Sequence, residues 1–383
     1  MKRKILFVIE SLGGGGAEKV LSTIVKHIDK ERFDVTVCPI VGTGPYVEDI
    51  KKYANYRPIL RDKASLSPIG RIWYAIKYKL IYNILPLSWV YKLWIPKGYD
   101  TEIAFCEGFA TKLMSTSTNK KAQKIAWVHT DLKINPWTQE MGIFKNISEE
   151  TKAYSHFGKI ITVSKSVEQS FSDVYGQNNK ICTIYNPIDS EEIITKSNIS
   201  SLGKDNKYRK QLNIITIGRL VHLKGYDILV RIVKRLLDEG YKLHLDILGE
   251  GDERAKLESY ITNNNLANNI TLLGFQKNPY QYIANSDLFV CSSRSEGYSL
   301  VIAEALVLGV PVISTYCSGP NELLNEGEYG MLVENNEDGE GLYNGIKKLL
   351  DDRELLSKYQ EKAITRGSTF GVSSIMNKIE SII

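Results

Sequence analysis

The residues from Ser295 to Leu306 have the types and spacing to bind an anionic ligand. They follow an apolar, strand-like run and open an apolar helix. We expect Glu296 where the loop meets the helix, and the amides of residues 297–299 as first-turn donors aimed at an anion such as a diphosphate. Glu296 and Glu304 could accept hydrogen bonds from sugar and ribose hydroxyls. The alternative is a helix-start acid and a solvated surface acid, although the apolar neighbours of Glu304 favour a buried acid with a partner.

A second candidate binding segment, Gly218 to Gly225, directly follows the strand-like run 213–217. It places Arg219 and Lys224 five residues apart at the carboxyl edge of the expected sheet. Arg suits bidentate contact with phosphate, and Lys supplies a point charge. Two solvated loop cations are the alternative, but the neighbouring anion site favours a binding role.

Two weaker signals follow strands in the first half of the chain. Four glycines, Gly13 to Gly16, lead into a helix expected to begin near Ala17, and they permit close approach of a ligand. Glu18 stands where the dinucleotide fingerprint needs its third glycine, so a dehydrogenase is disfavoured, and a flexible turn is the alternative. His129 follows the run 125–128, where it could meet a sugar hydroxyl or remain a satisfied loop histidine.

Composition points to two α/β domains. The chain has 383 residues and a net charge of +5, with the basic excess in its first 200 residues. Its five cysteines are scattered, its histidines form no ligand cluster, and it contains no Asp-x-Asp triplet, so neither a zinc site nor metal-held diphosphate is expected. No apolar run is long enough to span a membrane, and the N-terminus lacks the pattern of a signal peptide.

Short β-branched runs alternate with amphipathic stretches, which is typical of parallel sheets with crossover helices. Ligands bind beyond the carboxyl ends of such strands, so a cleft between two such domains is the expected site. We place the boundary in the polar segment 190–210. The predicted strands cover 4–9, 35–40, 102–105, 125–128, 160–163, 182–185, 214–217, 243–248, 270–273, 288–291, 310–314 and 331–333.

Taken together, these motifs resemble the retaining glycosyltransferases of family 4, which have the GT-B fold. The likeness covers almost the whole chain. It is most similar to enzymes that build capsule, exopolysaccharide or O-antigen units. Its marks are Gly15–Glu18, Gly218-Arg219 with Lys224-Gly225, Gly249–Gly251, Glu296 with Glu304, and also Val163-Ser164, Asn186–Asp189 and Cys317–Glu322.

The resemblance implies two Rossmann-like domains whose parallel sheets face an interdomain cleft. Residues 1–190 would form the acceptor-side domain and 191–365 the nucleotide-sugar domain, with 366–383 a helix that packs back on the first. It also implies a metal-independent hexosyltransferase that uses a UDP-sugar and no cofactor. Tyr316 stands where the family often has an acid, so a donor preference does not transfer.

The resemblance also assigns roles to individual residues. Arg219 and Lys224 would bind the diphosphate and Glu304 the ribose, while Glu296 would hold the donor sugar beside His129. These roles make Glu296, His129, Arg219 and Lys224 the expected catalytic residues. The expected donor-binding residues are Gly15, Gly16, Arg219, Lys224, Glu250, Gly297, Tyr298, Ser299, Leu300 and Glu304.

The segment from Lys63 to Tyr99 contains no acidic residue and mixes basic with aromatic side chains. This pattern favours peripheral attachment to the cytoplasmic face of the inner membrane, with a lipid-linked glycan or glycolipid as acceptor. The alternative is an amphipathic helix packed on its own domain, and no nucleic-acid-binding module accompanies the segment. The predicted membrane or acceptor residues are Arg71, Trp73, Lys77, Lys79, Trp89, Lys92 and Trp94.

Two other functions fit the same motifs. A nucleotide-sugar epimerase of this fold would form product from the donor alone. A silent, membrane-bound protein would bind the donor without turnover, although the joint presence of Arg219, Lys224, Glu296 and Glu304 disfavours that.

Overall fold

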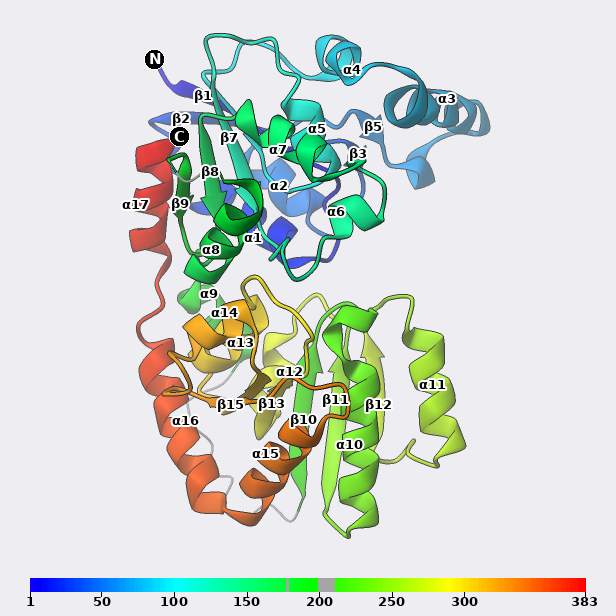
Figure 1. Cartoon of the computed structure of the whole chain (residues 1–383), viewed down its shortest axis with the longest axis vertical. Coiled ribbons are helices and arrows are strands. Elements are labelled where there is room, and N and C mark those ends of the chain that lie inside the picture. Colours follow the sequence, from blue (N-terminus) through cyan, green and yellow to red (C-terminus); the bar gives the residue numbers. More distant parts are fainter. Residues whose placement is uncertain (177–178, 199–210) are drawn as a thin grey trace. The chain divides into compact units, whose positions relative to one another are not determined.

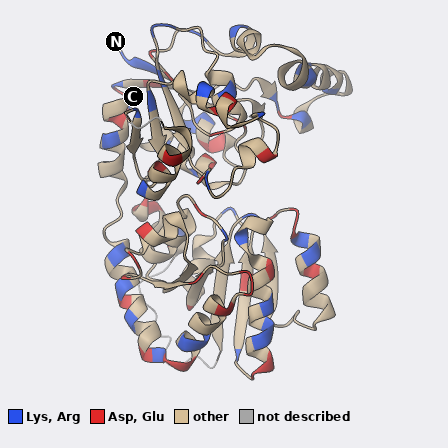
Figure 2. Ribbon diagram, in the orientation of Figure 1, with Lys and Arg blue, Asp and Glu red and all other residues tan. Residues whose placement is uncertain are grey.

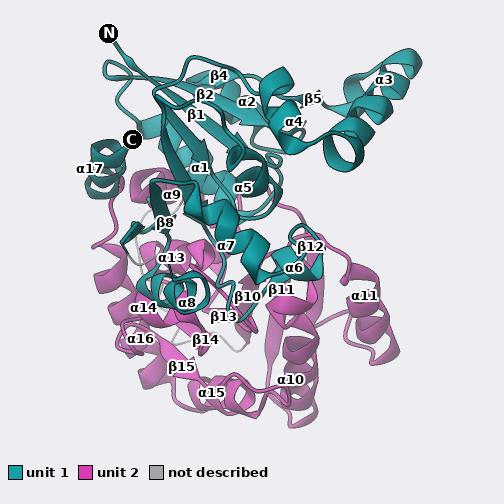
Figure 3. Cartoon of the chain, turned by 45° about the horizontal axis from the view of Figure 1, so that its top comes forward, with its two compact units in different colours: residues 1–187, 373–383 teal, residues 188–372 magenta. Residues whose placement is uncertain are grey.

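The computed structural model describes residues 1–176, 179–198 and 211–383, and it forms two compact units (Figure 3). Unit 1 comprises Met1–Pro187 and Ser373–Ile383, and unit 2 comprises Ile188–Val372. The unit boundaries therefore lie after residues 187 and 372, whereas the sequence placed them after 190 and 365. The polar segment begins with helix α9 (Ser190–Ser197), and most of its remainder lies outside the described residues.

Unit 1 is built on a seven-stranded parallel sheet with the order β4-β2-β1-β6-β7-β8-β9 (Figure 1). The inner strand β1 is fully apolar from Ile5 to Ile9 and buried there, as expected for a parallel strand covered on both faces. A separate two-stranded pair joins β3 to β5. The strands are β1 Arg3–Ile9, β2 Phe33–Pro39, β3 Val41–Gly42, β4 Asn55–Tyr56, β5 Leu60–Arg61, β6 Thr101–Ala104, β7 Gln123–Val128, β8 Lys159–Thr162 and β9 Ile181–Thr183.

Helices connect the strands of unit 1. The segment that follows β5 departs from this plan, because four helical elements, η1, α3, η2 and α4, precede β6. The helical elements are α1 Gly16–His27, α2 Val47–Tyr53, η1 Lys63–Ser65, α3 Pro68–Lys79, the π-helix η2 Leu80–Ile84, α4 Leu87–Trp94, α5 Phe109–Met114, α6 Trp137–Glu140, α7 Ile147–Ser155, α8 Lys165–Tyr175 and α17 Val372–Ile382.

Unit 2 contains a six-stranded parallel sheet with the order β12-β11-β10-β13-β14-β15, flanked by helices (Figure 1). The apolar faces of α10 and α15 pack with β10, β11 and β13 in one core. The elements are β10 Leu212–Ile217, η3 His222–Lys224, α10 Tyr226–Asp238, β11 Leu243–Leu248, α11 Arg254–Asn263, β12 Ile270–Gly274, α12 Tyr280–Asn285, β13 Leu288–Cys291, α13 Leu300–Val307, β14 Val312–Thr315, α14 Ser318–Leu323, β15 Met331–Val333, α15 Glu340–Asp351 and α16 Arg353–Gly367.

The C-terminal helix α17 returns the chain to unit 1. Glu380 accepts a hydrogen bond from the Asp29 amide (2.8 Å) and pairs with Arg32 (2.9 Å). Gln123 on β7 donates to the Ile382 carbonyl (2.9 Å). Three polar contacts thus attach the end of the chain to the first sheet.

Every predicted strand has a counterpart in the structure, with ends that differ by no more than two residues. The predictions missed β3, β4 and β5, which have two residues each and carry no usable periodicity. In the described part of the chain, no helix combines the length and hydropathy of a membrane span.

Candidate active site

Three loops of unit 2 converge at the carboxyl edge of its sheet, after the neighbouring strands β11, β10 and β13. Gly249 has φ +140°, and a Cβ there would overlap the Gly218 carbonyl. Gly225 has φ +63°, and a Cβ there would overlap the Ser292 carbonyl. Both positions need glycine, because the loops touch backbone to backbone and because other residues rarely adopt such φ angles.

Lys224 and Glu296 form an ion pair across two of these loops. Their side chains are only 19% and 12% exposed. Ser293 donates to the same carboxylate (2.9 Å), and the Ser292 hydroxyl donates to the Lys224 carbonyl (2.8 Å). Two of the residues predicted from sequence therefore meet in a largely buried, polar setting, and the alternative of a solvated loop cation is wrong for Lys224.

Arg294, which the sequence reasoning missed, fastens the loop that carries Glu296. Its guanidinium pairs with Asp227 (2.9 Å) and Glu337 (2.6 Å) and donates to the His222 carbonyl (2.6 Å). Its amide donates to the Leu223 carbonyl (2.8 Å). The sequence shows only an arginine two residues before Glu296. The acidic partners of Arg294 lie 67 and 43 residues away in the chain, so no local pattern indicated the ion pairs.

Arg219 and Glu250 lie on the two adjoining loops. Arg219 is exposed and forms no ion pair with any residue that the structure describes, so its guanidinium is available to an anion. The Glu250 carbonyl accepts a hydrogen bond from Leu220 (2.9 Å), which brings the loops together. The Glu250 carboxylate, however, pairs with Arg254 (2.9 Å) on α11.

Helix α13 begins later than the sequence suggested. Ser299 is its N-cap and Leu300 its first residue, so the amides of Gly297 and Tyr298 precede the helix rather than open its first turn. The preceding loop is held by α14, because the Gly319 amide donates to the Glu296 carbonyl (3.0 Å). The Ser299 hydroxyl is buried and has no hydrogen-bond partner among the described residues.

Glu304 lies inside unit 2 rather than on its surface. Its side chain is 2% exposed, and every residue of α13 except Val301 is buried. The interpretation of Glu304 as a solvated surface acid is therefore wrong. A carboxylate this deeply buried needs polar contacts to offset its lost hydration.

In unit 1, the glycine-rich loop leads directly into α1. Gly15 is the N-cap of this helix and Gly16 its first residue. Leu12, just before the glycines, donates to the Thr43 carbonyl (3.0 Å), which ties the loop to the segment after β3. The structure thus places the loop at the N-terminus of a twelve-residue helix, where an anion or a polar ligand is favoured.

His129 occupies a partly buried position beyond the end of β7. Its ring packs against Phe105 and Trp127, with centroid distances of 5.0 Å and 6.3 Å. Burial lowers the pKa of His129 to about 4, against the opposing effects of the Glu107 carboxylate and a hydrogen bond with the Phe105 backbone. The imidazole is therefore neutral at pH 7, and its Nε2 has no partner within the described ranges.

Glu107 is a second acid that the sequence reasoning did not identify. Its carboxylate accepts a hydrogen bond from the His129 amide (2.9 Å), and it is buried. It follows β6, whereas His129 follows the neighbouring strand β7. The positions of both residues just after adjacent parallel strands could have indicated the contact.

The predicted membrane residues divide into two groups. Lys77 and Trp94 face the protein, because the Lys77 ammonium donates to the Ile59 carbonyl (2.7 Å) and lies 5.3 Å from the Trp94 ring centroid. These two side chains therefore make contacts within unit 1. The exposed group contains Arg71, Trp73, Lys79, Trp89 and Lys92.

The structure shows no group of three or more potential metal ligands among His, Cys, Asp and Glu within the residues that it describes. Cations and backbone amides are the groups that the described site offers to a diphosphate. Positive charge comes from Arg219 and from Lys224, whose charge is shared with Glu296.

The chain matches two family descriptions in tandem: Glycosyltransferase Family 4 over residues 14–192, and Glycosyl transferases group 1 over residues 200–366. It is 29% identical to the N-acetylgalactosamine-N,N'-diacetylbacillosaminyl-diphospho-undecaprenol 4-alpha-N-acetylgalactosaminyltransferase of Campylobacter jejuni, over 96% of each chain. It is 21% identical to the amylovoran biosynthesis glycosyltransferase AmsD of Erwinia amylovora, over 99% of each.

Solved structures share the fold. Anabaena Alr3699/HepE in complex with UDP-glucose matches with a TM-score of 0.74 at 20% identity, covering 99% of this chain and 98% of that one. Staphylococcus aureus TarM in complex with UDP matches with a TM-score of 0.71 at 15% identity, covering 99% of both. With two parallel Rossmann-like units and both family matches, this chain belongs to the family 4 retaining glycosyltransferases and has the GT-B fold.

Proposed function

We propose that this enzyme transfers a hexose or hexosamine from a UDP-sugar to a lipid-linked glycan or glycolipid in the synthesis of a surface polysaccharide or glycolipid. The lipid-linked acceptor is supported by the near full-length similarity to the Campylobacter transferase, whose acceptor is an undecaprenol diphosphate glycan. The shared fold of UDP-bound and UDP-glucose-bound structures supports the uridine donor.

The loops of unit 2 suit the donor. Arg219 would contact the diphosphate with its unpaired guanidinium, and Lys224 would add a second positive charge. Glu296 is already oriented by Lys224 and Ser293, so it can receive hydroxyl hydrogen bonds from the donor sugar. Glu304 would bind the ribose, and residues 297–300 would line the approach to the sugar. Glu250 would contribute through its backbone while its side chain remains with Arg254.

Unit 1 would contribute two further features that suit a sugar substrate. The neutral His129 can contact a sugar hydroxyl without opposing the positive charge that develops at the anomeric carbon. Gly15 and Gly16 would allow the loop before α1 to approach the sugar. In these roles the protein groups of both units bind the substrates. The bonds that form and break are those of the donor and the acceptor.

In the proposed step, the acceptor hydroxyl attacks the anomeric carbon on the face from which the diphosphate departs. A bond forms between the acceptor oxygen and that carbon, and the bond from that carbon to the phosphate oxygen breaks. The hydroxyl proton passes to the departing UDP oxygen. The enzyme contributes mainly by stabilising the diphosphate charge with Arg219, Lys224 and backbone amides, without a metal ion or other cofactor.

This function places the enzyme at the cytoplasmic face of the inner membrane, where it would be a peripheral protein. The test is a panel of nucleotide sugars, with release of nucleoside diphosphate measured in the presence and absence of a membrane lipid extract. We expect release from one UDP-sugar only with lipid present, and a labelled sugar in the lipid fraction. Conversion of the donor alone to an isomer would instead establish an epimerase, and unlabelled lipid with every donor would contradict the proposal.

A further inference from the structure

Helix α3 presents apolar side chains to the outside of unit 1. None of its twelve residues is buried, and Figures 1 and 3 show it standing out from the sheet of its unit. Four of its side chains lie on one helical face by their spacing of three and four residues. They are Ile69, Ile72, Trp73 and Ile76, which are 69%, 61%, 67% and 44% exposed.

The other side of α3 is fastened to unit 1. Lys77 holds the Ile59 carbonyl, and the rings of Tyr74, Tyr78 and Tyr82 follow one another with centroid distances of 6.2 Å and 4.5 Å. Tyr82 then packs on Phe109 (4.4 Å). The side of α3 opposite the apolar face therefore makes specific contacts with unit 1, although Tyr78 itself remains 42% exposed.

Exposed apolar side chains also occur on the two elements that follow α3 in the chain. Ile84 at the end of η2, and Trp89 and Leu93 on α4, are 57%, 59% and 59% exposed. An exposed apolar face such as that of α3 marks an interaction site rather than ordinary surface variation. We call the seven exposed side chains on α3, η2 and α4 the docking surface.

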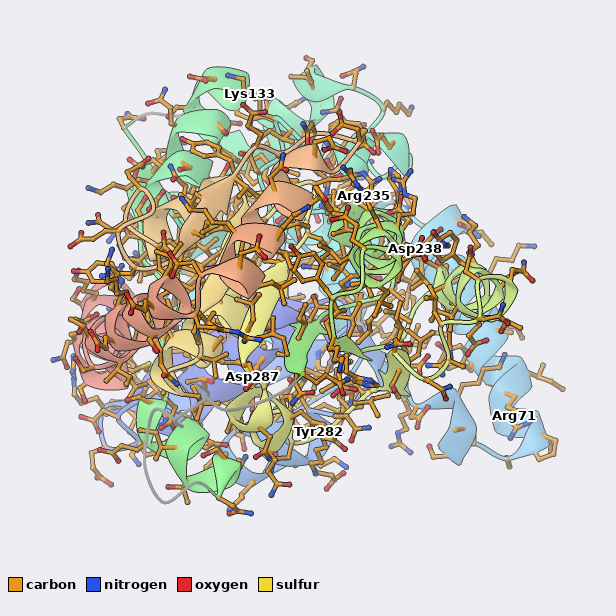
Figure 4. All side chains as sticks on the ribbon, turned by 90° about the horizontal axis from the view of Figure 1, so that it is seen from below. Arg71, Lys133, Arg235, Asp238, Tyr282 and Asp287 are labelled. Atoms are coloured by element: carbon orange, nitrogen blue, oxygen red, sulfur yellow. The ribbon has the colours of Figure 1, made fainter. Side chains whose placement is uncertain are left out.

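The charges around the docking surface have a single sign. No Asp or Glu occurs from residue 63 to residue 99, and Figure 2 shows basic but no acidic residues on α3. Lys79 adjoins the apolar face three residues after Ile76, and Lys92 lies beside Leu93, while Arg71, labelled in Figure 4, is exposed on another side of the helix. Tryptophan and isoleucine flanked by lysine suit the interface of an anionic bilayer, whereas a protein partner would need no uniform positive charge.

We propose that the docking surface inserts into an anionic lipid bilayer, with Ile69, Ile72, Trp73 and Ile76 entering the acyl boundary and Lys79 and Lys92 at the headgroups. This inference names the membrane contact of the proposed function and rests on it only for the choice of acceptor. The Tyr82 hydroxyl contacts the carboxylate of Glu10, three residues before the glycines. Insertion therefore holds the glycine-rich loop at a fixed place relative to the bilayer, which suits an acceptor carried on lipid.

The test is co-sedimentation with phosphatidylcholine vesicles with and without phosphatidylglycerol. The full chain should pellet with anionic vesicles, and the variant Ile72→Ser/Trp73→Ser/Ile76→Ser should lose at least tenfold in partition. A matched variant, Ile134→Ser/Met141→Ser/Ile147→Ser, removes three other exposed apolar side chains of unit 1 and should bind like the wild type. Trp73 should also contribute to the blue shift of tryptophan emission on binding, so Trp73→Phe should reduce that shift.

Equal binding by the α3 variant and the wild type, or equal loss in the matched variant, would overturn the proposal. So would light scattering that shows a wild-type dimer, a monomeric α3 variant and no vesicle binding, because a second copy would then cover the surface. Failure of the proposed function is a separate result. Vesicle binding without sugar transfer from any donor would contradict the proposed function but support membrane docking. Sugar transfer to detergent-dispersed lipid without vesicle binding would contradict membrane docking but support the proposed function.

Discussion

Lys224 and Glu296, which lie 72 residues apart in the chain, form an ion pair at the carboxyl edge of the second sheet. Both side chains are largely buried, and Ser293 supports the carboxylate. In the proposed function, this pair would link a group that contacts the diphosphate to one that contacts the sugar. Its half-buried position also makes its removal measurable in stability as well as in activity.

We expect Lys224→Ala to lower the stability of unit 2 by about 2 kcal/mol, because it leaves the Glu296 carboxylate without its counter-charge. The double variant Lys224→Met/Glu296→Gln should recover much of that loss, because neither remaining group is charged. Thermal unfolding of the full chain measures both. A double variant that recovers no stability relative to Lys224→Ala would show that the two residues are not energetically coupled. Both variants should lose roughly a hundredfold or more in turnover.

Arg294 positions the loop of Glu296 without itself being expected to touch the substrate. Arg294→Lys keeps the charge but loses the planar fork that reaches Asp227, Glu337 and a backbone carbonyl. We expect turnover to fall about tenfold, with a smaller change in the KM for the donor. Arg235→Lys is the matched control, because Arg235 forms a surface ion pair on α10 (Figure 4) and its replacement should change little. Equal effects of the two substitutions would contradict a positioning role.

His129 should make the stability of unit 1 depend on pH. Its pKa is 6.5 in the unfolded chain and about 4 when folded, because burial opposes the charged form. Because the folded pKa is lower than the unfolded pKa, the contribution of neutral His129 to the free energy of unfolding is fully present above pH 6.5. This contribution falls by about 3 kcal/mol as the pH is lowered towards 4. Denaturant unfolding of His129→Asn should lack this part of the pH dependence, whereas the exposed-site control His156→Asn should retain it. Parallel pH profiles for the wild type and His129→Asn would contradict the assignment.

Gly249→Ala should destabilise unit 2 by several kcal/mol, because its Cβ would overlap the Gly218 carbonyl and its φ of +140° is unfavourable for alanine. Gly240→Ala is the control. Gly240 also has a positive φ, +91°, but its Cβ would meet nothing within 4 Å. The control should therefore lose only about 1 kcal/mol. If thermal unfolding gives the two variants the same midpoint, the close approach of the two loops is not maintained in solution.

The sequence predicted the strands and the segments that carry the site, because buried parallel strands are continuous apolar runs and loops at their carboxyl ends share one edge. It did not predict the contacts between segments. The partners of Arg294 and the contact of Glu107 with His129 depend on strand order, which no local pattern encodes. The inward orientation of Lys77 depends on the Ile59 carbonyl, a backbone group from another segment.

The start of α13 shows a second kind of limit. Residues 297–299 have no strong helix breaker beyond Gly297, so the sequence allowed the helix to begin there. The hydrogen bond from the Gly319 amide to the Glu296 carbonyl holds the loop in a non-helical path, and the helix begins only at Leu300. A tertiary contact therefore overrides the local preference, and the donor amides of the site are partly those of a loop.

The most direct test of the proposed diphosphate site is calorimetric titration of the full chain with UDP in the presence of EDTA. If Arg219 and Lys224 hold the diphosphate, UDP binds without a divalent ion, and Arg219→Ala/Lys224→Ala binds it at least a hundredfold more weakly. Arg231→Ala/Lys234→Ala on α10 removes two cations from the surface of the same unit and should bind UDP like the wild type. Binding that requires added Mg²⁺, or undiminished binding by Arg219→Ala/Lys224→Ala, would contradict the claim that these two side chains hold the donor diphosphate.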